Sequence, residues 1–250
     1  MNLYRVIFFL VLSALPLLGF SQPPELLDRP VGDLGAAVFR TSSYVNTVSS
    51  STDVLPYAYL DQGRFFARID TFGVKTIPVG YGYLELAGRV NFEGFSTQHL
   101  LGLSSRKDPV LLGLGTYQET PLGGFFFNVF YDANNSGGYL SDLMYAAEFQ
   151  LPKKLVVYPQ LGLEYKSKKY TNYFYGVSPS ESSQGGYAQY LAPSSISPYL
   201  GFLLEVPVAQ NWNMHALVKR KFIDSAISNS PIVNQRYQDI YFLSLDYRFK

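Results

Sequence analysis

The sequence predicts an all-β protein, a transmembrane antiparallel up-and-down β-barrel, and three observations lead to this prediction. Segments of about ten residues alternate apolar and polar side chains with a period of two, which is typical of strands with two different faces. Their connections alternate between short turns and long polar loops, and aromatic residues gather near the strand ends. Strands of this length suit a tilted bilayer span, because strands of soluble proteins usually run about five or six residues. A secreted soluble β protein, whose apolar faces share a core, is the alternative.

The chain begins with a predicted signal peptide over residues 1–21. Arg5 supplies the positive charge, an apolar run follows at 6–18, and small residues precede the cleavage that we predict after Ser21. The apolar run is too short for a membrane helix, which needs about 20 residues. We therefore expect residues 22–250 to form one barrel domain in the outer membrane of a Gram-negative cell.

Ten segments carry the alternation that predicts strands. In the clearest one, 155–166, Leu161 and Leu163 fall on one face, whereas Gln160 and Glu164 fall on the other. In chain order the predicted strands are 33–42, 54–61, 64–76, 81–93, 122–132, 139–151, 155–166, 199–208, 212–221 and 241–249.

Counting crossings from both ends decides the number of strands. Both termini of such barrels normally lie in the periplasm, so the large loops 167–197 and 224–236 would face outside. The two counts agree only if 95–121 does not cross the membrane, which gives about ten strands and makes this segment a periplasmic or lumen-folded excursion. A crossing at 109–118 alone would give eleven, an odd number that single-chain bacterial barrels avoid. Twelve strands are the alternative and need one crossing more.

The last predicted strand ends in an aromatic pattern. Tyr247 and Phe249 stand on its apolar face, and Lys250 follows them. This pattern resembles the C-terminal strand by which outer-membrane proteins are recognised for assembly.

The polar faces of the predicted strands carry both signs of charge. A barrel of ten strands is narrow, and opposite charges inside it should pair because an unpaired buried charge is costly. We predict a mostly filled, salt-bridged lumen; a narrow pore for small polar solutes is the alternative. The predicted lumen charges are Arg68, Glu85, Arg89, Glu148, Glu164, Lys219, Asp246 and Arg248, together with Asp70, Asp142, Lys166, Glu205 and Lys221.

Composition and motifs argue against several functions. The chain has no cysteine, two histidines and a formal net charge of +1, which excludes thiolate chemistry and argues against a nucleic-acid partner. No Gly-x-Ser-x-Gly elbow is present. His215 could meet Ser244 and Asp246 if the strand registers allow it, but we predict a hydrogen-bonding role for it in the lumen. We expect no catalytic activity, no cofactor and no bound metal.

Two loop motifs resemble those of the MipA/OmpV family of outer-membrane proteins. Three weaker matches support them: 55–57 with 63–66 resembles the family's first hairpin, 112–115 its Gly-Leu-Gly segment, and 44–47 part of its first loop. The first motif consists of Tyr173, Phe174, Tyr175, Gly176, Val177, Ser178 and Pro179. The second follows Asn229 and consists of Ser230, Pro231, Ile232 and Val233.

The resemblance implies a scaffold that links the outer membrane to peptidoglycan-remodelling enzymes. It implies two partners: the murein hydrolase MltA, which is a lytic transglycosylase, and a peptidoglycan synthase. Outer-membrane lipid is the expected surrounding, and the basic run Lys166, Lys168 and Lys169 could meet lipopolysaccharide phosphates. Because a murein partner lies in the periplasm, we expect 95–121 to be needed for its capture and 180–195 to be dispensable.

Overall fold

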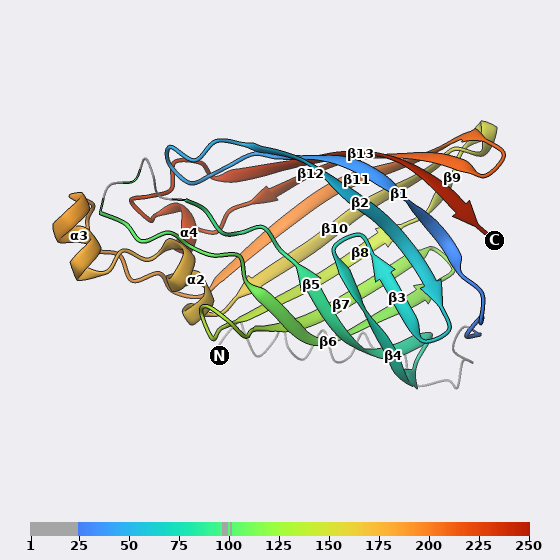
Figure 1. The fold of residues 1–250 in the computed structure, drawn as a ribbon, viewed down its shortest axis with the longest axis horizontal. Helices are drawn as coiled ribbons and strands as arrows, with labels where there is room; N and C mark the ends of the chain where they lie inside the picture. Colours follow the sequence, from blue (N-terminus) through green and yellow to red (C-terminus); the bar gives the residue numbers. More distant parts are fainter. Residues whose placement is uncertain (1–24, 97–99, 101) are drawn as a thin grey trace, which may run out of the picture.

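The protein is a closed antiparallel β-barrel in a computed structural model that describes residues 25–96, 100 and 102–250 (Figure 1). The predicted signal peptide, 1–21, lies outside the described residues. Among the helices of the described part, none is long and apolar enough to cross a membrane. The strands are β1 Val31–Thr41, β2 Ser51–Gln62, β3 Phe65–Arg68, β4 Thr71–Val79, β5 Gly82–Val90, β6 Val110–Thr120, β7 Gly123–Asp132, β8 Tyr139–Ala147, β9 Phe149–Gln150, β10 Val156–Lys166, β11 Ser195–Ala209, β12 Trp212–Phe222 and β13 Tyr237–Phe249.

The ring closes where the first strand pairs with the last. β1 pairs with β2 on one side and with β13 on the other, and each pairing is antiparallel over most of the strand. The order around the described ring follows the sequence, with β10 between β8 and β11. The short β9 continues the edge of β8 against the start of β10 and adds no crossing. The wall therefore has twelve strands, the alternative count that the sequence allowed.

Two regions account for the difference between ten strands and twelve. The predicted strand 64–76 is in fact β3 and β4, which turn back at Ile69, a residue with a left-handed φ of 60°. Residues 110–120 form the wall strand β6, paired with β5 and β7, so the predicted excursion over 95–121 is wrong. The alternation could not reveal the first of these turns, because β3 has only four residues.

The two faces of each strand differ as the alternation predicts. On β13, Leu243 and Leu245 are about half exposed on the outside, whereas Ser244 and Asp246 between them are buried in the lumen. An apolar outer face over a polar inner face is the pattern of a barrel surrounded by lipid. Closure also gives every wall strand a partner on both sides, which an open sheet in lipid would lack.

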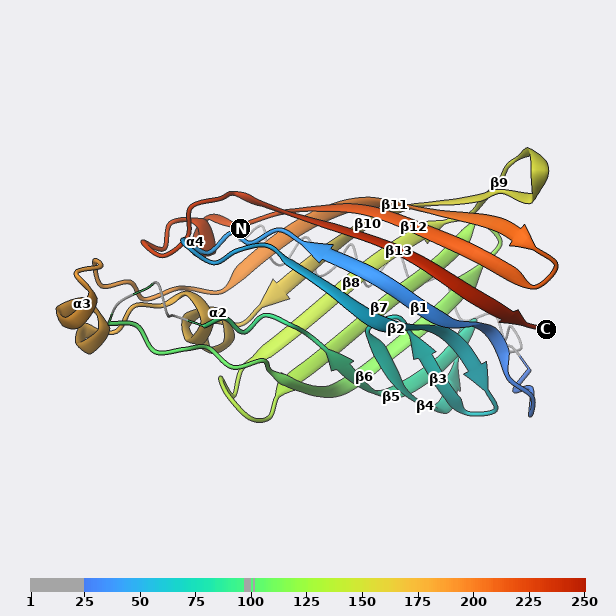
Figure 2. The ribbon, with the colours of Figure 1, turned by 45° about the horizontal axis from the view of Figure 1, so that its top comes forward.

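The two ends of the barrel are unlike. The start of β1, the end of β13 and the turns that follow β2, β4, β6 and β11 lie at one end, here called the turn end (Figure 1). The helices α2 (Lys168–Tyr175), α3 (Pro179–Gly185) and α4 (Ser225–Ser228) lie at the other, the cap end. At the turn end, β9 and the 3-10 helix η1 (Pro152–Lys154) project as a finger, defined as residues 148–155 (Figure 2).

Candidate functional site

A cap built from four connections covers one mouth of the barrel. We define the cap as the described residues within 42–50, 91–109, 167–194 and 223–236. Its core belongs to a continuous cluster of buried side chains that includes Tyr44, Leu103, Phe174, Ile227 and Ile232. Because these residues come from segments far apart in the chain, packing among them fixes all four connections over the mouth.

Helix α2 carries the first predicted loop motif into this core. Tyr170, Thr171, Phe174 and Tyr175 fall on one helical face and are buried, as the helical spacing requires. The helix ends at Gly176, where a Cβ atom would lie 2.4 Å from the carbonyl oxygen of Asn172. A residue with a side chain cannot take this position without moving the end of the helix.

The second motif packs against the first and is hydrogen-bonded to it. The hydroxyl of Ser230 donates a 2.6 Å hydrogen bond to the carbonyl oxygen of Tyr175. Ile232 is fully buried, and Val233 forms a β-bridge with Val45 of the first connection. Pro231 lies in the same turn. The structure thus brings the two motifs together, and their contacts join the loops to one another.

The remainder of the first motif starts helix α3. Val177 is buried and forms a β-bridge with Tyr190. Ser178 caps the helix by accepting from the backbone N–H of Glu181, whose carboxylate accepts from the backbone N–H of Ser178 in return, and Pro179 follows the cap. Tyr173, the first residue of the motif, packs edge-on against Phe174.

Glu181 ties this helix to the 91–109 connection. Arg106 Nη1 lies 2.9 Å from its carboxylate, and the backbone N–H groups of Ser178 and Ser104 donate to the same group. Burial alone would raise the pKa of Glu181, but these hydrogen bonds outweigh it and lower the pKa to about 2.

We expect the cap to loosen in acid because of this carboxylate. A pKa lowered by folding contributes stability above the unfolded value, about 4.3, and the contribution is lost as the pH falls toward about 2. The protection factors of the amides of residues 177–190, measured by hydrogen exchange in micelles and corrected for the chemical exchange rate at each pH, should therefore fall across this range. In Glu181→Gln the protection factors should be low already at neutral pH and should depend less on pH; an unchanged profile would contradict this account.

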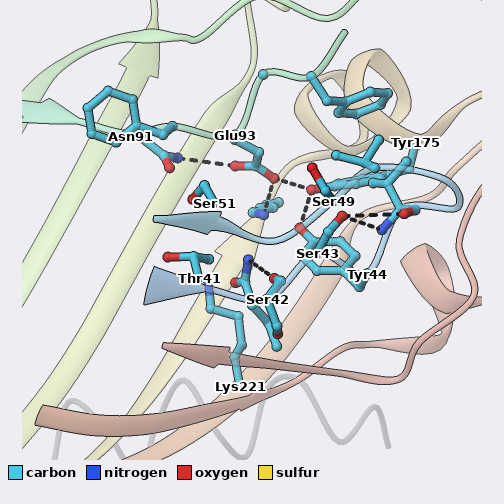
Figure 3. A pocket seen from close by; sticks show the side chains of 17 residues that line it. Thr41, Ser42, Ser43, Tyr44, Ser49, Ser51, Asn91, Glu93, Tyr175 and Lys221 are labelled. Carbon is cyan, nitrogen blue, oxygen red and sulfur yellow. Dashed lines mark hydrogen bonds and ion pairs between the residues drawn. The ribbon is translucent and has the colours of Figure 1, made fainter. Parts of the chain in front are cut away.

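A polar cluster lies at the base of the cap, where Lys166 of β10 meets residues of three cap connections (Figure 3). Glu93 forms an ion pair with Lys166 and accepts hydrogen bonds from the hydroxyls of Tyr170 and Tyr175, and the Tyr175 hydroxyl also meets that of Tyr44. Burial and the charge of Glu93 raise the pKa of both Tyr170 and Tyr175 well above the usual value. A cavity of about 140 Å³ adjoins this cluster between 41–51 and 91–95.

Lower in the lumen, ion pairs link strands that are not neighbours. Arg89 on β5 pairs with Asp142 on β8 at 3.2 Å, and Asp142 also accepts from Tyr199 on β11 at 2.8 Å. At the turn end, Arg248 on β13 binds Glu205 on β11, two strands away, and also Asp33 on the adjacent β1. These contacts lie at separate levels of the lumen, and the cap covers one of its mouths.

The remaining predicted lumen charges take the following places. Arg68 pairs with Glu85 at 2.9 Å, and Arg89 also lies 3.6 Å from Asp70. Glu164 contacts Lys166 and Lys221, whereas Lys219 lies over the ring of Tyr199. Asp246 accepts from His215. Glu148 is the exception: it is exposed at the turn end, beyond the last residue of β8, because the strand ends at Ala147.

The predicted assembly residues, Tyr247 and Phe249, lie near the end of the last strand, on its outward face. Tyr247 pairs with Leu34 across the closing seam, and its ring packs edge-on against Trp212 and Phe249. Contacts among aromatic rings near the turn end are typical of an interfacial girdle.

His215, Ser244 and Asp246 come together, but not as a catalytic triad. His215 Nδ1 lies 2.9 Å from Asp246 Oδ1, and Ser244 donates to that same oxygen at 2.7 Å. A triad needs the serine at Nε2, opposite the carboxylate. Here Ser244 Oγ is 3.5 Å from Nδ1 and is buried. This group therefore lacks the arrangement for acyl transfer.

Comparison with known proteins agrees with this architecture. The family model described as MltA-interacting protein MipA matches residues 34–249. The putative outer membrane protein YiaT of Escherichia coli K12 is 23% identical over 244 residues, covering 95% of this chain and 96% of that protein. The outer membrane protein OmpV of Vibrio cholerae is 28% identical and covers 74% and 70% of the two chains. The MltA-interacting protein of E. coli K12 is 25% identical over 148 residues, 59% of each chain. The protein is thus an outer-membrane β-barrel of Gram-negative type, and it belongs to the MltA-interacting protein MipA family.

Proposed function

We propose that this protein is a membrane-anchored scaffold that binds a murein lytic transglycosylase at the turn end of its barrel. Outer-membrane barrels place short turns in the periplasm and long loops outside. The turn end then faces the peptidoglycan, and the cap faces the exterior. One relative bears the name MltA-interacting protein, which is consistent with such a partner.

The proposal rests on the finger, residues 148–155. Phe149, the first residue of β9, and Leu151, which follows β9, are 54% and 44% exposed. A pocket of about 710 Å³ lies between the finger, the β11–β12 turn and the chain end. An apolar anchor beside a pocket is the arrangement that concentrates binding energy in protein interfaces. A peptidoglycan synthase would reach the same face.

The channel alternative gains no support from the described lumen. Arg89, Asp142 and Tyr199 connect three strands across it, and the cap covers one mouth.

The third proposed contact is with the membrane itself. The outer strand faces meet lipid, and Lys168 and Lys169 are exposed at the cap end, where lipopolysaccharide phosphates would lie; Lys166 is buried and unavailable.

Phe149→Ser combined with Leu151→Ser should reduce capture of the transglycosylase at least tenfold. Both side chains are exposed, so the barrel should keep its heat-modifiable migration in gels, while an interface loses its apolar anchors. The measurement is affinity capture of the tagged protein from gently solubilised envelopes, with the co-purified proteins quantified by mass spectrometry.

The matched control is Leu191→Ser, which changes a side chain 67% exposed at the cap end. Capture should be unaffected by this change and by deletion of 180–185. In the segment 95–121, the described residues of 95–109 join the cap and 110–120 form the wall strand β6, so only its last residues, at the β6–β7 turn, lie at the turn end. Loss of capture in the cap variants, with the finger variant unaffected, would contradict the proposal.

A further inference from the structure

The wall between β2 and β5 is continuous only in its turn-end half. β3 and β4 lie between these two strands, but they are short and turn back at Ile69 (Figure 1). β3 pairs only with residues 59–62 of β2. Nearer the cap, residues 51–57 of β2 pair with β1 alone, and no hydrogen bond in the described part of the chain joins them to residues 91–95, which continue from β5. We call the space between 51–57 and 91–95 the side opening.

Along the side opening, β2 has a free strand edge. The backbone N–H of Ile69 donates to the carbonyl oxygen of Ala58, so the polar groups of Ala58 point away from β1. Backbone groups alternate between the two sides of a strand, and those of Thr52, Val54 and Pro56 therefore point to the same open side. A proline at such a position removes a donor that no neighbouring strand needs, as is usual for edge strands.

The outer rim of the side opening is apolar. Val54 is 74% exposed, and Phe92, which continues the outward row of Leu86 and Val90, is 64% exposed. Hydrocarbon therefore reaches the opening, but it offers no hydrogen-bond partner to the free edge of β2. A polar group has to come to this level of the wall to satisfy that edge.

The inner side of the opening is polar and accessible. Asp53 lies on the inward face of β2 and is nevertheless exposed. Asp70, in the β3–β4 turn, is 54% exposed although it lies 3.6 Å from the largely buried Arg89. The cavity of about 140 Å³ lies at the cap side of the opening, with Ser51 and Asn91 in its lining (Figure 3). The opening thus leads from an apolar surface to polar groups.

A cation stands beside the free edge without a carboxylate. Arg40 of β1 lies opposite Thr52 in the register, on the outward face, and is exposed. Side chains opposite each other on neighbouring strands are about 5 Å apart at Cβ, so the long Arg40 side chain reaches the edge. Within the described residues Arg40 forms no ion pair, whereas the outward-facing Arg220 of β12 pairs with Asp239 at 2.6 Å. A free guanidinium is suited to binding a phosphate.

We propose that the side opening binds one phospholipid from the leaflet around the cap end of the barrel. Its acyl chains lie against Val54 and Phe92, and its phosphate accepts hydrogen bonds from Arg40 and from the free backbone N–H groups of Thr52 and Val54. An amphiphile fits because the site changes from apolar to polar across the wall. A peptide strand fits less well, since Pro56 cannot donate to it.

The test adds phosphatidylglycerol to the full barrel refolded in micelles of an uncharged detergent. Native mass spectrometry should show one lipid retained per chain. A phosphatidylglycerol with a diazirine near its head group should, after illumination, form adducts mainly in 51–57 and 91–95. Arg40→Gln should weaken lipid binding about tenfold, because it removes the charge that meets the phosphate. Arg40 is exposed, so the variant should keep its heat-modifiable migration.

Arg220→Gln is the matched control, because this outward-facing arginine already has a carboxylate partner. It should leave lipid binding unchanged. Hydrogen exchange supplies a second control within β2, where lipid should slow the amide of Val54 but not that of Leu55, which points to β1. Adducts spread evenly over the outer face, or equal binding by Arg40→Gln, would overturn the proposal. So would a Val54 amide already as protected as that of Leu55 without lipid, which would show that another strand covers the edge.

Discussion

Lys166→Met should lower the free energy of unfolding by about 3–5 kcal/mol, because it leaves a buried carboxylate without its cation. The Lys166 side chain is 3% exposed and pairs with Glu93, which is 7% exposed. Two tyrosine hydroxyls would still bind Glu93, but they carry no positive charge. Denaturant unfolding of the refolded barrel in micelles measures the loss.

Two controls separate this explanation from general damage to the barrel. Adding Glu93→Gln to Lys166→Met should recover most of the loss, because the uncompensated charge is then gone. Arg220→Met removes a cation that also pairs with a carboxylate, Asp239, at 2.6 Å, but Arg220 is 47% exposed. It should change stability little, because water and salt screen an exposed pair. An equal loss from both single changes would contradict the role of burial.

Phe174→Ala should open the cap while the barrel remains intact. Phe174 is fully buried, and its ring packs against those of Tyr170 and Tyr173 with centroids 4.9 Å away in both cases. Loss of a buried phenylalanine costs about 3–5 kcal/mol. Both of these rings belong to the cap, so most of this cost should fall on the cap. Trypsin added to intact cells should then cleave after Lys168 and Lys169 at least tenfold faster.

Leu191→Ala in the same loop is the control, because that side chain is 67% exposed. Its cleavage rate should equal that of the unaltered protein. Heat-modifiable migration should be normal in both variants. Unaltered cleavage in Phe174→Ala would show that the cap does not depend on this core.

The fold was largely predictable because alternation reports directly which face of a strand meets lipid. Strands β10 to β13 are long and two-faced, and the predicted segments match them within a few residues. The hairpin of β3 and β4 could not be found in this way. Its first strand is four residues long, and Ile69 reverses the chain without glycine or proline. The missed crossing of β6 followed from this, because an even count had to be kept.

The candidate sites were predictable only in part. The loop motifs were identified as a set, but their contacts, such as Ser230 with Tyr175, depend on where the loops fold over the mouth. The lumen position of charges such as Arg248 follows from alternation alone. Which charges pair depends on register and on strand order, since Arg89 meets a carboxylate three strands away. Alternation gives the face of a residue but not its neighbour across the lumen.

The composition of the cap has a consequence for the order of biogenesis. Ser230 and Ile232 precede β13, the strand that closes the ring against β1. The aromatic face of α2 is therefore synthesised well before the segment that covers it. Until β13 pairs with β1, the segment that covers this face is attached to the wall on one side only, and intermediates that expose apolar surface are prone to aggregation. Sealing of the outer mouth and closure of the ring are consequently coupled late steps, and a chain stalled before β13 would need protection until both are complete.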